Sequence, residues 1–406
     1  MNSSIVIPAV FAFFVLIFPA FGGGLSEQPI LFIVVVFSLA YILISFDFFS
    51  GNVSIPFYFF LLMELFLIIA WSFDIFYGIA GLSDIPSLFR AAGMAFMYLS
   101  FFVLFNRNKI IASVFLDYFV VFSFFILCLF FILSMTFSGY PDFVARWYFP
   151  QERFKENAFL SVFASTYFAA YFYYIIYAYS MCRLFFFEVN FKWVCVSLGS
   201  MVFVFLSQGK TAYLSVFITF FLILFIRSKM FFKILLLVLL VFSALFFLYY
   251  FDYMRELLLR SDFYSLKQLS IILDGGFESV SVSERIEQII FSINSSLDHY
   301  MLSVGLGRGI YLESFAASYI YRYGVLGFSV YCFFYIYIGF KAYRVFNKGV
   351  DFNDRLIGAF IFVWVFNLPF LMLSNPMFEM GKNSIFSILL VSLFFYNSRY
   401  PSRKLL

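Results

Sequence analysis

The chain has 406 residues, of which 64% are hydrophobic and 12% are charged, and its formal net charge at pH 7 is +4. A water-soluble globular protein is about half apolar and about a quarter charged. A soluble fold of this length cannot bury so much apolar surface, so the composition excludes one and predicts a protein whose solvent is the lipid bilayer. The apolar segments are long and continuous, which favours helices over the short alternating strands of a membrane barrel.

The first apolar run, Ile5 to Phe21, has no basic segment before it and no small-residue cleavage site after it. It therefore predicts a retained helix and not a secretory signal peptide. The four cysteines lie in or beside apolar runs and form neither a CxxC pair nor a metal-ligand spacing. Neither a disulfide framework nor a zinc site is expected from Cys128, Cys182, Cys195 and Cys332.

Twelve apolar runs follow one another along the chain, and each is about long enough for a transmembrane helix. They lie at roughly 5–21, 30–46, 55–72, 88–105, 111–135, 158–180, 192–206, 211–226, 231–251, 314–340, 356–374 and 383–398. The seventh and eighth runs are short, so a tilted or re-entrant pair is the alternative for them. The predicted fold is an all-α polytopic membrane protein with about twelve transmembrane helices.

One long polar segment divides the chain. The predicted order is nine spans in 1–251, a large loop at 252–313, three spans in 314–398 and a basic tail at 399–406. An even number of spans places both termini on the same side of the membrane.

Lys and Arg gather on one side of the predicted membrane. The loops and tail on the side of the termini hold fourteen basic residues against four acidic ones, whereas acidic residues outnumber basic ones on the other side. Because basic loops stay in the cytoplasm, we expect both termini to be cytoplasmic, in the inner membrane of a bacterium. The large loop between spans nine and ten is then periplasmic.

The large loop is expected to contain an amphipathic helix. In the stretch SERIEQIIFSI, helical spacing places four isoleucines on one face: Ile286, Ile289, Ile290 and Ile293. Such a helix is typical of segments that lie along the membrane interface.

The loop ends in a glycine-rich stretch, Gly305-Leu306-Gly307-Arg308-Gly309, which has the composition of a phosphate-binding loop. No buried strand precedes it, and cytoplasmic nucleotides do not reach the outer side, so a nucleotide site is not expected. A flexible turn that leads into span ten is the structural alternative. The charged residues around the stretch favour a functional interpretation.

Several cations are predicted near the outer ends of the spans. Arg322 lies about two turns inside span ten, where a charge costs roughly 2.5–3.5 kcal/mol unless it is paired or reaches water. Snorkelling of the side chain towards the surface is the alternative interpretation. Lys210 and Arg90 also lie at the outer ends of predicted helices.

Cations at the outer mouth of a helix bundle are suited to binding a lipid-linked diphosphate at the depth of the headgroups. Glu313 lies close to them in the sequence and is a candidate general base for a hydroxyl group. This combination favours glycosyl transfer from a polyprenyl diphosphate, with arginines stabilising the charge on the leaving diphosphate. The sequence contains no DxD cluster, so a reaction without metal or cofactor is expected.

Three other ionisable residues have weaker claims to function. His299 is the one histidine of the chain and lies in the large loop, where a histidine is most often an ordinary solvated residue. Glu64 and Asp117 fall inside spans three and five, with no evident basic partner in the sequence. Each is a candidate proton-relay group.

Three short motifs and the layout of the whole chain carry a resemblance to a known family. SQGKTAYLSVFITFFLILF at 207–225 places Lys210 among small residues where a helix opens, and SVSERIEQI at 281–289 contains Arg285. VGLGRGIYLESFAASYIYRYGVLGFSVY at 304–331 combines G-x-G, Glu-Ser and Y-G-x-x-G elements. The chain thereby resembles the O-antigen polymerase and O-antigen ligase superfamily, multi-spanning membrane glycosyltransferases with a large periplasmic loop before their last helices.

The resemblance implies an enzyme that acts on undecaprenyl-diphosphate-linked oligosaccharide units in lipopolysaccharide biosynthesis. It implies Glu313 and Arg285 as catalytic residues. The implied diphosphate- or substrate-binding residues are Lys210, Arg322, Arg308, Arg90, Tyr323 and His299. Lys210 stands where the family usually has Arg, and Glu313 stands where ligases generally carry His, which favours a polymerase.

The alternatives are a ligase that transfers the polymer to lipid A core and, from a different class, a flippase for the lipid-linked sugar. The expected partners are the lipid-linked donor and acceptor, the bilayer and a chain-length regulator. No nucleic-acid partner and no metal are expected.

Overall fold

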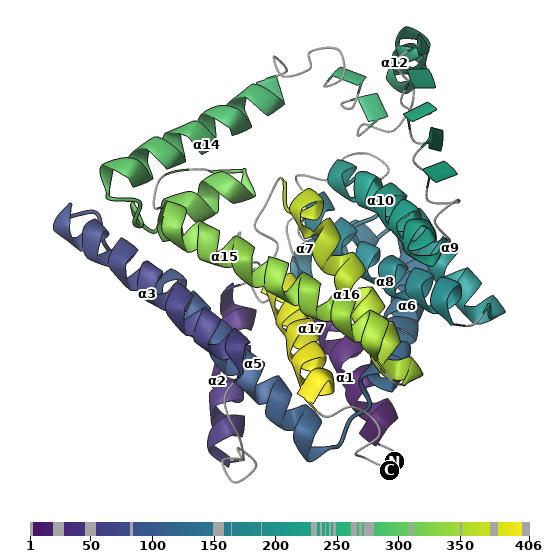
Figure 1. Ribbon diagram of the computed structural model, residues 1–406, viewed down its shortest axis with the longest axis horizontal. Coiled ribbons are helices and arrows are strands. Elements are labelled where there is room, and N and C mark those ends of the chain that lie inside the picture. Colours follow the sequence, from purple (N-terminus) through teal and green to yellow (C-terminus); the bar gives the residue numbers. More distant parts are fainter. Residues whose placement is uncertain are drawn as a thin grey trace.

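The computed structural model describes residues 3–18, 28–44, 54–81, 84–148, 158–163, 165–187, 189–228, 249–260, 280–307, 310, 312–349, 351–373 and 381–399. It also describes the pairs 234–235, 238–239, 241–242, 245–246, 266–267 and 270–271. Within these residues the protein consists of helices joined by turns and loops, and none of them forms a strand (Figure 1). The predicted all-α class is therefore confirmed.

The helices follow the predicted apolar runs closely. They are α1 (Ser3–Ile17), α2 (Gln28–Ile44), α3 (Ile55–Phe76), α4 (Ile85–Leu88), α5 (Arg90–Arg107), α6 (Ala112–Thr136), α7 (Tyr140–Trp147), α8 (Thr166–Phe186), α9 (Phe191–Leu206), α10 (Lys210–Arg227), α12 (Phe251–Leu259), α14 (Val280–Asp298), α15 (Phe315–Lys348), α16 (Phe352–Leu371) and α17 (Gly381–Arg399). A helix occupies every predicted span except 231–251, about half of which lies outside the described residues.

Among the described residues, five helices are long and apolar enough to cross a membrane, namely α3, α6, α10, α15 and α16. α1, α2 and α9 are apolar over shorter stretches, Ile5–Ile17, Val34–Ile44 and Phe191–Leu206. Several helices that could cross a membrane are thus present, whereas the number twelve stays a prediction.

The predicted sixth span starts too early. Residues 158–163 form a turn and irregular backbone, and α8 begins only at Thr166. The Ser165 hydroxyl accepts a hydrogen bond from Phe168 N at 3.3 Å, which caps the first turn. The apolar character of Ala158 to Phe163 reflects burial against the bundle rather than a continuing helix.

The chain termini and the helices of the large loop lie at opposite ends of the molecule (Figure 1). α1 begins and α17 ends at the same end of the molecule, here called the terminal end. α12 and α14, the two helices described within 252–313, lie at the opposite end, here called the loop end. This arrangement agrees with a large loop on the side of the molecule away from the termini.

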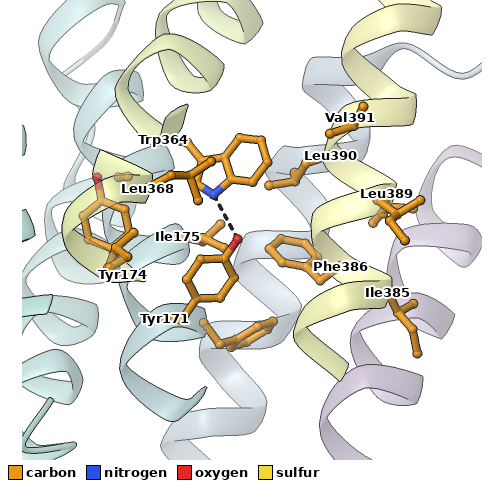
Figure 2. Close-up of a cluster of buried hydrophobic side chains, with 14 of the residues drawn as sticks. Tyr171, Tyr174, Ile175, Trp364, Leu368, Ile385, Phe386, Leu389, Leu390 and Val391 are labelled. Carbon is orange, nitrogen blue, oxygen red and sulfur yellow. Dashed lines mark hydrogen bonds between the residues drawn. The ribbon is translucent and has the colours of Figure 1, made fainter. Parts of the chain in front are cut away.

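The core is built around α8, whose side chains from Ala169 to Cys182 are all buried. Trp364 Nε1 of α16 donates to the Tyr171 hydroxyl at 3.2 Å (Figure 2). The same hydroxyl lies 2.7 Å from Ser387 Oγ of α17. Trp364 Nε1, the Tyr171 hydroxyl and the Ser387 hydroxyl thus satisfy one another inside the aromatic core. The contacts hold α8, α16 and α17 together.

α15 is a hairpin of two helices and not one straight rod. Its backbone is non-helical at Gly324, where φ is 73° and ψ is 171°, a region that essentially only glycine adopts. The ring centroid of Phe315 lies 5.5 Å from that of Tyr331. Sixteen residues of straight helix would separate these rings by about 24 Å. Residues 315–323, the short arm, therefore fold back along residues 325–348, the long arm.

The prediction of one continuous span at 314–340 is therefore wrong in its first third. The long arm alone rises about 36 Å, which is enough to cross a hydrocarbon core of about 30 Å. The short arm is a separate helical segment of the loop end. Its residues include Arg322 and Tyr323, which consequently lie beside the reversal of the chain and not inside a spanning helix.

Candidate functional site

Arg285 and Glu313 come together at the loop end of the molecule. Arg285 Nη2 of α14 lies 4.0 Å from Glu313 Oε2, just before the short arm of α15. The two side chains are 26% and 45% exposed, so the pair is partly desolvated yet open to a ligand. The resemblance implies these two residues as catalytic, and the packing of α14 on α15 brings them into an ion pair.

Gln288 fixes the backbone on which Glu313 stands. Its Oε1 accepts hydrogen bonds from Glu313 N at 3.0 Å and from Ser314 N at 3.3 Å. Ser314 occupies the N-cap position of α15 but makes no side-chain cap of its own. The side chain of Gln288, one turn after Arg285, therefore takes over the capping of the short arm and sets the position of Glu313 relative to α14.

The loop between α14 and the short arm forms hydrogen bonds with the backbone on both sides of the reversal at Gly324. Val304 N donates to Tyr321 O at 2.9 Å, and Leu326 N donates to Met301 O at 3.2 Å. Val325 N donates to the Ser296 hydroxyl at 3.1 Å. These bonds satisfy backbone groups that an uninterrupted helix would satisfy internally. The hairpin and the loop thus form one unit.

Asp74, at the end of α3, holds the glycine-rich stretch in place. Its Oδ2 accepts from Leu306 N at 2.9 Å, and its side chain is almost fully buried. A Cβ on Gly305 would lie 2.5 Å from Asp74 Oδ1, so only glycine fits beside this carboxylate. Over Gly305 to Gly307 the predicted turn is therefore held in place by Asp74. Arg308, also predicted as a binding residue, lies outside the described residues.

Arg322 lies against this turn. A Cβ built on Gly307 would be 3.8 Å from Arg322 Nε, and the Arg322 side chain is half-buried. Along the short arm, nine residues separate Arg322 from Glu313, which corresponds to a rise of about 13 Å. Arg322 and the Arg285–Glu313 pair therefore lie at opposite ends of the short arm.

His299 and Tyr323 are placed by structural contacts. His299 follows Arg285 by fourteen residues, about 21 Å along α14, so it lies away from the ion pair. Its Nδ1 lies 2.8 Å from Ser295 O and its Nε2 lies 3.5 Å from the Tyr77 hydroxyl, so the ring ties α14 to α3. Tyr323 is buried, with its ring centroid 5.1 Å from that of Tyr319.

Lys210 and Arg90 lie on other elements. Lys210 is the half-buried first residue of α10, which packs on α8 and α16, whereas α14 packs on α15. Arg90 is the first residue of α5, and its Nη2 donates to the Ser87 hydroxyl at 3.4 Å. The structure therefore joins Arg285, Glu313 and Arg322 in one unit and leaves these two cations outside it.

The two carboxylates predicted within spans have structural partners. Glu64 Oε2 accepts from Ala92 N at 2.8 Å and so caps the start of α5. Asp117 Oδ1 accepts from the Tyr179 hydroxyl at 2.7 Å, and Asp117 Oδ2 lies 3.3 Å from Arg183 Nη2. The expectation that neither has an evident basic partner is wrong for Asp117.

Among the described residues, no three or more His, Cys, Asp and Glu side chains gather in a way that would hold a metal ion. No protein-family model matches the chain, and no curated protein is found to be similar to it. Any function therefore has to be inferred from the residues and geometry of the loop end.

Proposed function

We propose that the protein is an O-antigen polymerase, which joins undecaprenyl-diphosphate-linked oligosaccharide units at the periplasmic face of the inner membrane. The observation that carries this proposal is the contact between Arg285 and Glu313 at the loop end. It places a carboxylate beside a guanidinium on a fixed hairpin, at the end of the molecule away from the termini. A group-transfer site for a hydroxyl acceptor and a diphosphate donor needs both groups close together.

In the proposed reaction, a hydroxyl at the non-reducing end of the acceptor unit attacks the anomeric carbon of the donor chain. The bond from that carbon to the diphosphate oxygen breaks, and undecaprenyl diphosphate leaves with the bonding electron pair. Glu313 takes the hydroxyl proton, since its half-exposed carboxylate is open to an acceptor. One glycosidic bond forms for each diphosphate released.

The arginines have the second role. Arg285 would stabilise the charge that develops on the departing diphosphate, and Arg322, farther along the short arm, would hold the second lipid-linked diphosphate. Bidentate guanidinium–phosphate contacts suit both tasks. Lys210 is proposed to attract diphosphates from α10 at the mouth of the bundle, with Arg90 and Arg308 as lesser contributors.

The same features favour a polymerase over a flippase. A flippase needs charges along the depth of a central path, because its substrate crosses the membrane. In the described part of the chain, the in-span carboxylates Glu64 and Asp117 are occupied in helix capping and an ion pair. The residues of the proposed site lie instead at one end.

Reconstitution of the purified protein in liposomes with undecaprenyl-diphosphate-linked repeat units tests the proposal. We expect lipid-linked products of two, three and more units, with one undecaprenyl diphosphate released for each new linkage. Units that cross the bilayer without elongation would identify a flippase. Transfer that occurs only when lipid A core is added would identify a ligase.

A further inference from the structure

A pocket of about 320 Å³ opens at the terminal end of the molecule, far from the proposed site. Its lining residues belong to the ends of α8 and α15 and to the start of α16. Four aromatic side chains and one cation line it, namely Phe186, Phe187, Phe346, Phe352 and Arg355. An aromatic wall with a single guanidinium is suited to an amphiphile that carries a negative charge.

The walls of the pocket are held by tight aromatic contacts. The ring centroids of Phe187 and Phe352 are 4.0 Å apart, and those of Phe186 and Phe346 are 5.0 Å apart. Arg183 braces the Phe352 wall, because its guanidinium carbon lies 4.8 Å from the centroid of that ring. The pocket is therefore preformed in the fold.

The charge of Arg355 is not neutralised by a carboxylate in the part of the chain that the structure describes. Its Nε donates to Phe346 O at 3.3 Å, a contact that orients the exposed guanidinium. Asp354, the neighbouring acid, is buried and accepts a hydrogen bond from Asn397 Nδ2 at 2.9 Å. The arginine is thus free to bind an anion through its outer nitrogens.

We propose that this pocket binds an anionic phospholipid of the leaflet at the terminal end, with its phosphodiester on Arg355 and its glycerol and first methylenes against the phenylalanines. The pocket is too small for a whole lipid, so the acyl chains would run out into the bilayer. Basic pockets between helices on the cytoplasmic side recognise such headgroups. The inference does not depend on the proposed function, because it concerns the opposite end of the molecule.

Native mass spectrometry of the delipidated full chain in detergent tests the proposal, with phosphatidylglycerol and phosphatidylcholine as probes. We expect wild type to prefer phosphatidylglycerol and Arg355→Gln to bind it about fivefold more weakly, the effect of about 1 kcal/mol per arginine near an anionic surface. Gln keeps an N–H for the Phe346 carbonyl, so the fold is expected to persist. Arg344→Gln, at an exposed cation near the end of α15 that does not line the pocket, is the matched control.

Equal binding of phosphatidylglycerol by wild type and Arg355→Gln would overturn the proposal, as would equal binding of the two lipids by wild type. Displacement of the lipid by millimolar inorganic phosphate would overturn it in favour of a site for free phosphate. Phe352→Ala keeps Arg355 and removes one wall. It is expected to weaken binding of phosphatidylglycerol, and unchanged binding in this variant would also contradict a lipid site.

Discussion

Glu313→Gln is expected to abolish chain extension while the protein still inserts into the membrane at wild-type levels. Glutamine preserves the size of the side chain but cannot accept the hydroxyl proton, and loss of a general base lowers a rate by about 10²–10⁴-fold. Arg285→Ala is expected to have the same phenotype, because the diphosphate would then leave without its counter-charge. The measurement is complementation of a deletion strain, read as the lipopolysaccharide ladder on a gel.

The chain offers a matched control for this pair. Arg260 and Glu256 of α12 also form an ion pair at the loop end, but both side chains are largely exposed, at 78% and 60%. Exposed pairs of this kind contribute about 0–1 kcal/mol. Arg260→Ala and Glu256→Gln are therefore expected to support a full ladder. A full ladder in Glu313→Gln or Arg285→Ala would contradict the assignment of the site.

Gly324→Ala is expected to cause the largest loss of folded protein among the glycine substitutions. Its backbone conformation costs a residue with a Cβ about 1–3 kcal/mol. In addition, the new Cβ would overlap backbone atoms of Met301 and Leu302, which cannot move without opening the loop. The measurement is the fraction of protein that stays monodisperse in detergent after heating.

Two other glycines separate the backbone effect from the overlap. Gly78 has a φ of 70° but nothing within 4 Å of a new Cβ, so Gly78→Ala is expected to cost only about 1 kcal/mol. Gly339 lies in the long arm, with Val365 Cγ1 at an ordinary contact distance of 3.5 Å, so Gly339→Ala is expected to be neutral or stabilising. If Gly324→Ala is as stable as Gly78→Ala, the close contact of Gly324 with the backbone of Met301 and Leu302 would be contradicted.

The positions of the helices follow from the sequence because a bilayer requires long apolar runs, and α3, α6 and α16 begin and end within a few residues of prediction. The α15 hairpin could not be predicted in the same way. Its short arm runs on in the sequence into the apolar long arm, and the reversal depends on the backbone conformation of one residue, Gly324. The glycine at the reversal itself, Gly324 after Tyr323, is the local sequence signal of it.

The charged residues of the site could be predicted from the sequence, but the polar residues that hold them in position could not. Glu313 stands out as a carboxylate close to cations near an apolar span, and Arg285 is implied by the resemblance of its motif, whereas Gln288 and Asp74 look like ordinary polar residues. Their roles depend on contacts between elements far apart in the chain, such as Asp74 with Leu306. The same reason explains the missed partner of Asp117, because Arg183 lies 66 residues away in the sequence.

The most direct test of the central claim is deletion of the gene in its host, followed by electrophoresis of the lipopolysaccharide. We predict that the ladder disappears and that core bearing a single repeat unit remains, because flipping and ligation would persist while polymerisation is lost. Bare core without any unit would contradict a polymerase and indicate a flippase or a ligase. Lipid-linked polymer accumulating outside the membrane would then identify the ligase.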